Sequence, residues 1–422
     1  MKMINKLKNK NVQVDAPPSK AYTLRALIIS SLAEGESKIN NPLLGEDQLN
    51  VIESLKALGV EIQQNNNTIS VKGLGGKYSP LSDFINVGES GVGMNFLLSA
   101  ACFSNKPIII TGAEGLLRRP IKEVVDGLLQ LGCKIEYLDE VGFPPVKMFN
   151  NGISGGLAKV FGEKTSQYFS SITIAAPYAE KEVKLNCIDN MTEKPYYDIT
   201  LEMMEKFGVH ASNNNYKEIT IPPRQKYKGC NLTVEGDYSS ASYFFLAAAI
   251  CKIKVMVRNL SRNSRQGDKE VLNLLERMGC EVATSDDGVC VIGNNLKSIE
   301  ADMSNIPDMV PTLAIAAAFA EGTTKITNIG HLRYKECDRL AVVVSELTKM
   351  GACAKHDNDS IIITGVKQLY GANIDPHNDH RIAMSFAIAG LVTGNQIIKD
   401  EKCVAKSFPD FWEKFEVFQK GQ

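Results

Sequence analysis

The stretch LKALGVEI at residues 55–62 reads as the end of a helix, a glycine and the start of a strand, and it recurs along the chain. The other copies are LLQLGCKI at 128–135, MEKFGVHA at 204–211, LERMGCEV at 275–282 and LTKMGACA at 347–354. Their glycines stand 71 to 76 residues apart. Because glycine just past a helix is the usual left-handed cap, each copy predicts a helix, a cap and a strand. Most copies continue with a polar turn and a second strand, as in QQNNNTISVKG.

A nearly all-apolar helix recurs with about the same spacing. Its six copies begin near residues 21, 91, 166, 239, 308 and 380. A helix that is apolar all round belongs in the interior, so six such helices with five amphipathic partners predict six copies of one α/β unit. The C-terminal SFPDFWEKF resembles the sixth amphipathic helix. We expect the N-terminal segment around Val12 and Val14 to supply the strands that this sixth unit lacks.

Three units per domain is the natural division of such a chain. The predicted terminal domain comprises residues 1–18 and 236–422 and is closed by both termini, and the predicted inserted domain comprises residues 19–235. The chain would leave the first domain near Pro17–Pro18 and return near Gly236. We expect an active site in the cleft between the two domains.

Composition limits the possible partners. The chain has 422 residues, of which 44% are hydrophobic and 23% charged, and its formal net charge is -1. We therefore expect neither nucleic acid nor an anionic membrane as a partner. Ten cysteines without a C-x-x-C pair and only five histidines argue against disulfides and a metal site.

The start of the chain indicates a cytoplasmic protein. Residues 1–10 are polar and basic and lack the apolar core of a signal peptide. The longest apolar stretches run to roughly a dozen residues, whereas a membrane-spanning helix needs about 20. We expect a cytoplasmic monomer without a cofactor.

Polar and basic residues occupy the starts of the apolar helices. A helix N-terminus suits phosphate or carboxylate, although Ser, Thr, Asp and Asn also favour these positions simply as caps. Basic residues there are harder to explain by capping. In the connections, HLRYKECDRL predicts Lys335 and Arg339 on one helical face with Glu336 between them, unless this is only a solvated charged face. KCVAKSFPDF predicts a loop that carries Lys406.

Ten motifs along the chain resemble signatures of the EPSP synthase (3-phosphoshikimate 1-carboxyvinyltransferase) family, in the family's order and over essentially the whole chain. The motifs are SK-x(4)-R at 19–25, RRP at 118–120, TSQ at 165–167, KPYYDIT at 194–200, VEGDYSSASYF at 234–244, SRQGD at 264–268, IPD at 306–308, KECDRL at 335–340, NDHRIAM at 378–384 and AKSFPD at 405–410.

The resemblance implies an α/β (α+β) fold, a two-domain inside-out α/β barrel with six βαβαββ-type units, three per domain. It also implies transfer of the enolpyruvyl group of phosphoenolpyruvate to the 5-hydroxyl of shikimate 3-phosphate by addition and elimination. This reaction belongs to the shikimate pathway of chorismate and aromatic amino-acid biosynthesis. It needs no cofactor or metal, and preplaced Arg and Lys side chains would balance the negative charges of the substrates.

By the same resemblance, particular residues are assigned roles. Those expected at phosphoenolpyruvate are Lys20, Gly91, Arg119, Gln167, Arg339, Arg381 and Lys406. Those expected at shikimate 3-phosphate are Lys20, Arg25, Thr165, Ser166, Gln167, Tyr196, Asp308 and Lys335. Asp308 is expected to act as general base on the 5-hydroxyl, while Glu336 and Lys20 compete for the role of acid at the methylene carbon.

Four positions depart from the family's pattern. Ala21 and Glu193 stand where serines are usual, Asn95 replaces an arginine, and His331 replaces an asparagine. A carboxylate at Glu193 would repel the substrate phosphate unless it pairs with Lys194 or turns away, so weaker substrate binding is expected unless nearby cations compensate.

The glycine at position 91 bears on glyphosate, which occupies the phosphoenolpyruvate site in this family. A methyl group there would crowd the inhibitor, so Gly91 predicts sensitivity.

Two other functions compete with this interpretation. The sister enzyme that acts on UDP-N-acetylglucosamine typically has Lys-Asn at its first helix and a catalytic cysteine near the equivalent of Arg119. Here the helix begins Ser19-Lys20, and residues 116–121 contain no cysteine. A non-catalytic binding homologue is the second alternative, supported only by the departures at Ala21, Glu193 and Asn95.

Overall fold

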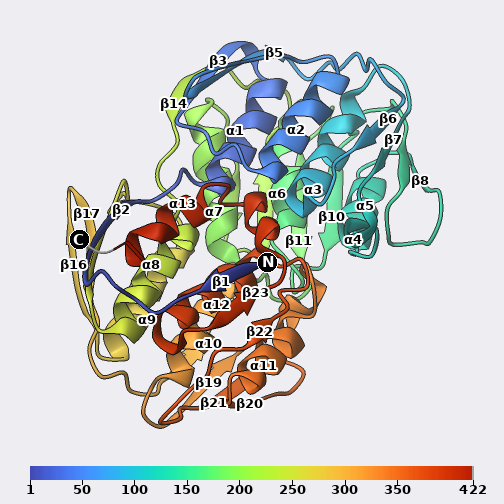
Figure 1. The fold of residues 1–422 in the computed structure, drawn as a ribbon. Helices are drawn as coiled ribbons and strands as arrows, with labels where there is room; N and C mark the ends of the chain where they lie inside the picture. Colours follow the sequence, from blue (N-terminus) through green and yellow to red (C-terminus); the bar gives the residue numbers. More distant parts are fainter. Residues whose placement is uncertain (421–422) are drawn as a thin grey trace. The chain divides into compact units, whose positions relative to one another are not determined.

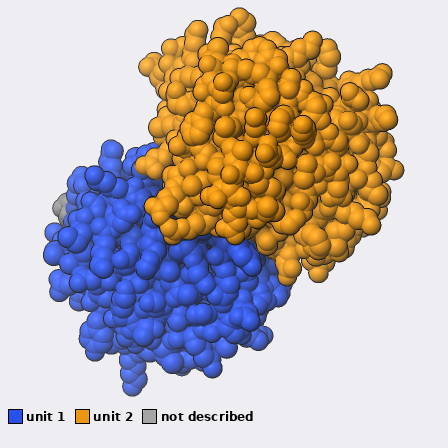
Figure 2. All heavy atoms as spheres, turned by 90° about the vertical axis from the view of Figure 1, so that its right-hand side faces the viewer, with its two compact units in different colours: residues 1–17, 235–422 blue, residues 18–234 orange. Residues whose placement is uncertain are grey.

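A computed structural model describes residues 1–420 and divides into two compact units. Unit 1 comprises residues 1–17 and 235–422, and unit 2 comprises residues 18–234 (Figure 2). Each unit has its own buried hydrophobic cluster. Within residues 1–420, no helix has the length and apolar character needed to cross a membrane.

Unit 2 is built on three buried helices, α1 (Lys20–Leu32), α3 (Gly91–Ala100) and α6 (Gln167–Ala175) (Figure 1). It has three four-stranded sheets, and the first has the strand order β14 (Asn231–Thr233), β3 (Glu34–Asn40), β5 (Thr68–Leu74) and β4 (Glu61–Asn65). The second has the order β6 (Phe84–Asn86), β7 (Ile108–Thr111), β9 (Val146–Met148) and β8 (Ile135–Tyr137). The third has the order β10 (Gly156–Val160), β11 (Val183–Cys187), β13 (Glu218–Ile221) and β12 (Ser212–Asn214). The remaining helices are α2 (Glu46–Ala57), α4 (Glu114–Leu117), α5 (Lys122–Gln130) and α7 (Lys194–Lys206).

Unit 1 has the buried helices α8 (Tyr238–Cys251), α10 (Val310–Ala318) and α12 (His380–Thr393), which pack against one another. Its first sheet has the strand order β16 (Glu281–Ser285), β17 (Gly288–Ile292), β15 (Lys254–Arg258) and β2 (Asn11–Asp15). The second has the order β18 (Glu300–Asp302), β19 (Thr323–Thr327), β21 (Ile361–Thr364) and β20 (Cys353–His356). The third has the order β1 (Lys2–Ile4), β23 (Gln396–Ile398) and β22 (Asn373–Ile374). The remaining helices are α9 (Val271–Arg277), α11 (Arg339–Lys349) and α13 (Phe411–Phe415).

The same strand pattern recurs in all five four-stranded sheets. One edge strand pairs parallel with its neighbour, and the other two pairings are antiparallel, as in β6–β7, β7–β9 and β8–β9. The predicted caps are confirmed, because the five glycines that follow the amphipathic helices all have positive φ, between 80° and 111°. These glycines are Gly59, Gly132, Gly208, Gly279 and Gly351. The left-handed backbone there turns each helix directly into the next strand.

The buried helices are apolar because every face of them packs on protein. In α8, all residues from Tyr238 to Ile250 are buried, and Phe244 stacks on Phe418 with ring centroids 6.1 Å apart. A fully buried side chain of this kind stabilises the fold by about 1.5–3 kcal/mol. The core of each unit therefore lies around its three buried helices.

The prediction that the segment around Val12 and Val14 completes the last unit was wrong, because this strand joins a different sheet. The strand that carries Val12 and Val14 pairs parallel with β15, in the first sheet after the return of the chain to unit 1. The C-terminal sheet is instead completed by β1, in which Lys2 lies opposite Ile398. The strand β2 alternates exposed and buried residues, whereas β1 has only three residues, of which Ile4 alone is buried. Neither pattern specifies which sheet the strand joins.

Candidate active site

A single guanidinium, that of Arg339, joins three carboxylates in unit 1. Arg339 Nε donates to Asp379 Oδ2 at 2.8 Å, Nη1 to Asp308 Oδ1 at 3.0 Å and Nη2 to Glu336 Oε2 at 3.0 Å. The Arg339 side chain is 1% exposed and that of Asp379 is not exposed. Three acidic partners raise the pKa of Arg339 against the lowering effect of its burial, so this cation is permanent.

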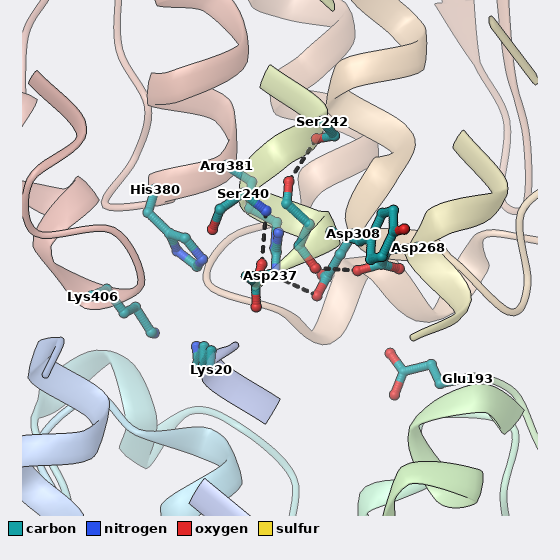
Figure 3. A network of polar contacts seen from close by, with 12 residues as sticks. Lys20, Glu193, Asp237, Ser240, Ser242, Asp268, Asp308, His380, Arg381 and Lys406 are labelled. Atoms are coloured by element: carbon teal, nitrogen blue, oxygen red, sulfur yellow. Dashed lines mark hydrogen bonds and ion pairs between the residues drawn. The ribbon is translucent and has the colours of Figure 1, made fainter. Parts of the chain in front are cut away.

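Two more cations bind the outer oxygens of the same carboxylates. Arg381 Nη2 lies 2.6 Å from Asp308 Oδ2, and Lys406 Nζ lies 2.8 Å from Glu336 Oε1. We call these residues the Arg339 cluster, and its members are Asp308, Glu336, Arg339, Asp379, Arg381 and Lys406. Figure 3 shows Asp308, Arg381 and Lys406 on the side of unit 1 where its buried helices begin.

The charges of this cluster control the protonation of Asp308. Burial by itself would raise the pKa of Asp308, but the positive charges of Arg381, Arg339 and Lys335 outweigh it and hold that pKa well below its usual value. The carboxylate is therefore ionised at neutral pH. It becomes an effective base only when bound negative charge offsets the surrounding cations.

Helix starts position most of the cluster. Asp308 lies in a short 3-10 turn, Pro307–Met309, that leads into α10. Asp379 caps α12 and accepts from the backbone nitrogens of Arg381 at 2.9 Å and Ile382 at 3.3 Å. Asp379 therefore has two tasks, since it both begins a helix and holds Arg339.

Two local predictions for this region were wrong. Lys335 and Arg339 do not share a helical face, because α11 begins only at Arg339 and Lys335 follows a 3-10 turn, Gly330–Tyr334. The helix cannot extend back to Lys335 because Asp338 is its N-cap, and the Asp338 side chain accepts from Ala341 N at 3.1 Å. Lys406 ends a 3-10 helix, Glu401–Lys406, rather than lying in an open loop.

The VEGDYSS and SRQGD motifs hold the start of α8. Asp237 accepts from Ser240 N at 2.7 Å (Figure 3), and the hydroxyl of Ser239 donates to Asp268. Gln266 accepts from Tyr238 N at 2.9 Å and donates to Gly236 O at 2.8 Å. These contacts lie within the protein, so they account for both motifs through capping and loop attachment.

In unit 2, the first residue of α1 carries a buried ion pair. Lys20 Nζ lies 2.5 Å from Asp47 Oδ2, and the Asp47 side chain is 2% exposed. Asp47 belongs to the first turn of α2. Asp47 could not be predicted from the sequence as a partner of Lys20, because their pairing depends on how α1 and α2 pack.

Gly91 and Arg119 are neighbours at the start of α3. A Cβ built on Gly91 would lie 3.1 Å from Arg119 Nη1 and 4.0 Å from Leu116 Cδ1. The adjacent Arg118 forms an exposed pair with Glu114. The close approach of Arg119 explains the need for a glycine at position 91 through space rather than through backbone conformation.

Arg25 is buried and engaged by the protein. It is 2% exposed, and it donates to the Thr200 hydroxyl at 2.8 Å, to Tyr196 O at 2.7 Å and to Ala21 O at 3.1 Å. Burial lowers the pKa of Arg25 to about 10, so it stays charged at neutral pH. Thr200 is a positioning residue that the sequence reasoning did not identify.

The TSQ motif lies between two of the residues that depart from the family's pattern. Asn95 Nδ2 donates to Gln167 Oε1 at 3.0 Å, and Gln167 N donates to the Thr165 hydroxyl at 3.2 Å. The Thr165 hydroxyl in turn donates to the carboxylate of Glu193, and the Ser166 hydroxyl donates to Glu193 O at 3.0 Å. Asn95 and Glu193 thus form the two ends of one hydrogen-bonded chain.

We treat the predicted residues of each unit as one group. In unit 2 the group contains Lys20, Arg25, Gly91, Arg119, Thr165, Ser166, Gln167 and Tyr196, placed by the starts of the buried helices and by the segments beside them. In unit 1 it contains Asp308, Lys335, Glu336, Arg339, Arg381 and Lys406. Both groups are rich in cations, and the group in unit 2 adds hydroxyl donors, which suits anionic ligands.

The family model of EPSP synthase (3-phosphoshikimate 1-carboxyvinyltransferase) matches residues 4–415. A protein named 3-phosphoshikimate 1-carboxyvinyltransferase from Methanoculleus marisnigri is 42% identical over 94% of each chain. A relative of the same name from Syntrophobacter fumaroxidans is 40% identical over 98% of this chain and 99% of its own. The solved EPSP synthase of Acinetobacter baumannii superposes with a TM-score of 0.82 at 29% identity, over 99% of this chain and 97% of that one.

Proposed function

This chain belongs to the EPSP synthase family, and from that premise we propose how its residues divide the work of the family's reaction. The enzyme transfers the enolpyruvyl group of phosphoenolpyruvate to the 5-hydroxyl of shikimate 3-phosphate, in the shikimate pathway. The products are 5-enolpyruvylshikimate 3-phosphate and phosphate. The match over residues 4–415, with the Arg339 cluster intact, is the observation that carries this conclusion.

We propose that the phosphoenolpyruvate site consists of Lys20, Gly91, Arg119, Gln167, Arg339, Arg381 and Lys406. Five of these side chains are cationic, and the ligand carries both a phosphate and a carboxylate. Arg side chains suit bidentate contacts with such groups. The close approach of Arg119 to Gly91 supports the proposal, because a side chain at position 91 would displace that guanidinium. We expect the enzyme to be glyphosate-sensitive.

We propose that shikimate 3-phosphate is held by Lys20, Arg25, Thr165, Ser166, Gln167, Tyr196, Asp308 and Lys335. Arg25 has donors bound to Thr200, Tyr196 and Ala21, so its contribution is its fixed charge together with its remaining N–H groups. The hydroxyls of Thr165 and Ser166 precede α6 and donate to Glu193. Rotation of these hydroxyls toward a bound phosphate would supply donors of the kind that a phosphate accepts.

In the reaction, Asp308 acts as the base that removes the proton of the 5-hydroxyl. Its lowered pKa fits a group that is ionised before substrate binds, and the negative charge of the substrates then makes it more basic. Protonation of the methylene carbon of phosphoenolpyruvate falls to Glu336, with Lys20 as the competing acid. Loss of phosphate from C2 of the tetrahedral adduct, together with removal of a proton from its methyl group, restores the double bond and completes the transfer, while Arg and Lys side chains stabilise the charge that develops.

The family resemblance also supports a finer description of the fold. We propose a two-domain inside-out α/β barrel of six βαβαββ-type units, with domains at residues 1–18 plus 236–422 and at 19–235. We further propose that the two groups of site residues together make one active site between the domains, in a monomeric cytoplasmic enzyme.

Phosphate release tests the function directly. The protein is incubated with shikimate 3-phosphate and phosphoenolpyruvate, and inorganic phosphate is measured. We expect release that requires both substrates, that is lost in Glu336→Gln, and that persists in Arg258→Lys, which alters only an exposed pair with Asp15. No release, together with activity toward UDP-N-acetylglucosamine, would overturn the proposal.

A further inference from the structure

Glu193 lies inside the group of residues assigned to shikimate 3-phosphate. It precedes α7 in a left-handed conformation with φ 56°, and it is 3% exposed. Its carboxylate accepts the Thr165 hydroxyl, and its backbone oxygen accepts the Ser166 hydroxyl at 3.0 Å. The start of α6 and the start of α7 are therefore joined through this one residue.

Charged groups of α1 and α7 lie near this carboxylate. From α1, the Arg25 guanidinium is close enough that the negative charge of Glu193 raises the pKa of Arg25. From α7 itself comes Lys194, whose Nζ lies 5.5 Å from the centre of the Tyr216 ring. Tyr22 and Tyr196 are titratable neighbours of Arg25. The start of α6 contributes the uncharged Thr165, Ser166 and Gln167, and Lys164 before it pairs with Glu123 at 2.5 Å.

A phosphate monoester would upset this balance. It carries about -1.5 to -2 charges at neutral pH, and it would bring them close to the carboxylate of Glu193. Two buried anions side by side do not both stay fully ionised, because the energetic cost is relieved when one of them takes up a proton. The Thr165 hydroxyl has a single proton to donate, and the carboxylate now holds it.

We propose that Glu193 couples binding of the substrate phosphate to a proton, which is taken from solvent and shared between the carboxylate and the phosphate. The shared proton lies in the hydrogen bond between the two acids, and it belongs to the pair rather than to either group. The Thr165 hydroxyl then turns its own proton to the phosphate. This proposal rests on the proposed function, since it takes shikimate 3-phosphate as the ligand.

The coupling gives binding an unusual pH dependence. A cationic phosphate site without a carboxylate favours the dianion, so its affinity weakens as the pH falls through about 6. With Glu193 the sign is reversed, because each proton taken up on binding tightens the affinity by about tenfold per unit of falling pH. The residue therefore selects the protonated form of the complex.

Calorimetric titration with shikimate 3-phosphate at neutral pH, in two buffers of different ionisation enthalpy, counts the protons. We expect uptake of about one proton per site in the wild type and none in Glu193→Gln, which keeps the size and hydrogen-bonding capacity of the side chain. Glu202→Gln is the matched control. Glu202 lies within α7, which Glu193 precedes, and it accepts the Tyr22 hydroxyl at 2.5 Å. The Glu202→Gln variant should keep the uptake.

Zero uptake or proton release in the wild type would overturn the proposal, as would unchanged uptake in Glu193→Gln. If Glu193→Gln does not fold, phosphorus NMR of the ligand bound to the wild type decides the matter. A resonance fixed at the dianion position across the neutral range rules out a shared proton. Failure of shikimate 3-phosphate to bind at any pH would refute the proposed function, whereas binding without uptake refutes only the role of Glu193.

Discussion

Replacing Arg339 by methionine tests whether the Arg339 cluster stabilises unit 1 as well as serving the substrates. Methionine has a similar length and removes the charge that Asp308, Glu336 and Asp379 share. Two of these carboxylates keep a cation, because Arg381 lies 2.6 Å from Asp308 and Lys406 lies 2.8 Å from Glu336. Asp379, which is not exposed, loses the guanidinium.

The cost of that loss can be worked out from the contacts that remain. Leaving a buried charge without its partner destabilises a protein by about 3–5 kcal/mol. Asp379 keeps its two backbone donors, at 2.9 Å and 3.3 Å, so we place the loss near the lower limit, at about 3 kcal/mol. For a unit of this size the urea slope is near the upper end of its range, about 3 kcal/mol per molar, so the midpoint should fall by about 1 M.

The assay is equilibrium unfolding in urea followed by tryptophan fluorescence. The chain has a single tryptophan, Trp412 in α13 of unit 1, so the signal reports the unit that carries the mutation. Arg258→Met is the control, because it breaks a bidentate pair with Asp15 whose two side chains are 48% and 52% exposed, and it should cost about 1 kcal/mol or less. Equal midpoint shifts in the two variants would refute the reasoning.

Three further predictions concern the site. Gly91→Ala should displace Arg119 by a few tenths of an ångström, because the new Cβ lies 3.1 Å from Nη1; we expect a higher KM for phosphoenolpyruvate and weaker inhibition by glyphosate, and unchanged values for both would contradict the contact. Asp308→Asn and Glu336→Gln should each lower kcat by about 10²–10⁴-fold with modest change in KM, and a loss confined to KM would assign them to binding alone. The lowered pKa of Asp308 means that its ionised form stabilises unit 1 above pH ~4 and that this contribution is lost as the pH falls further; acid titration of the Trp412 signal should therefore be shallower in Asp308→Asn, and identical titrations would count against it.

Local signals in the sequence predicted much of the fold. The glycine caps and the all-apolar helices could be read directly, because each depends on the residues of one turn or one helix. Pairing between distant strands could not be read in this way. Neither the Val12 strand nor the Lys2 strand has a pattern that specifies its partner, and only the packed unit determines that one joins β15 and the other β23.

The site shows the same limit. Motifs identified residues such as Arg339 and Lys406 by their positions in the chain, but not the side chains that hold them. The role of Asp47 as the partner of Lys20 follows only from the packing of α2 beside α1. The helix α11 begins only at Arg339 because the side chain of Asp338 caps it. The spacing of charges in KECDRL does not show this local interaction.

The pairing of β2 with β15 affects the order in which the two units fold during synthesis. Its partner β15 lies far ahead along the chain, and Asp15 and Arg258, which pair at the end of the two strands, are 243 residues apart. At about 5–20 residues per second, a ribosome needs roughly 10–50 s to make that interval. During this time all of residues 18–234 are synthesised. Unit 2 can therefore fold as an uninterrupted segment before β15, the partner of β2, has been made. Nascent chains arrested before β15 should therefore contain a protease-resistant unit 2 behind an N-terminal arm that proteases still cut.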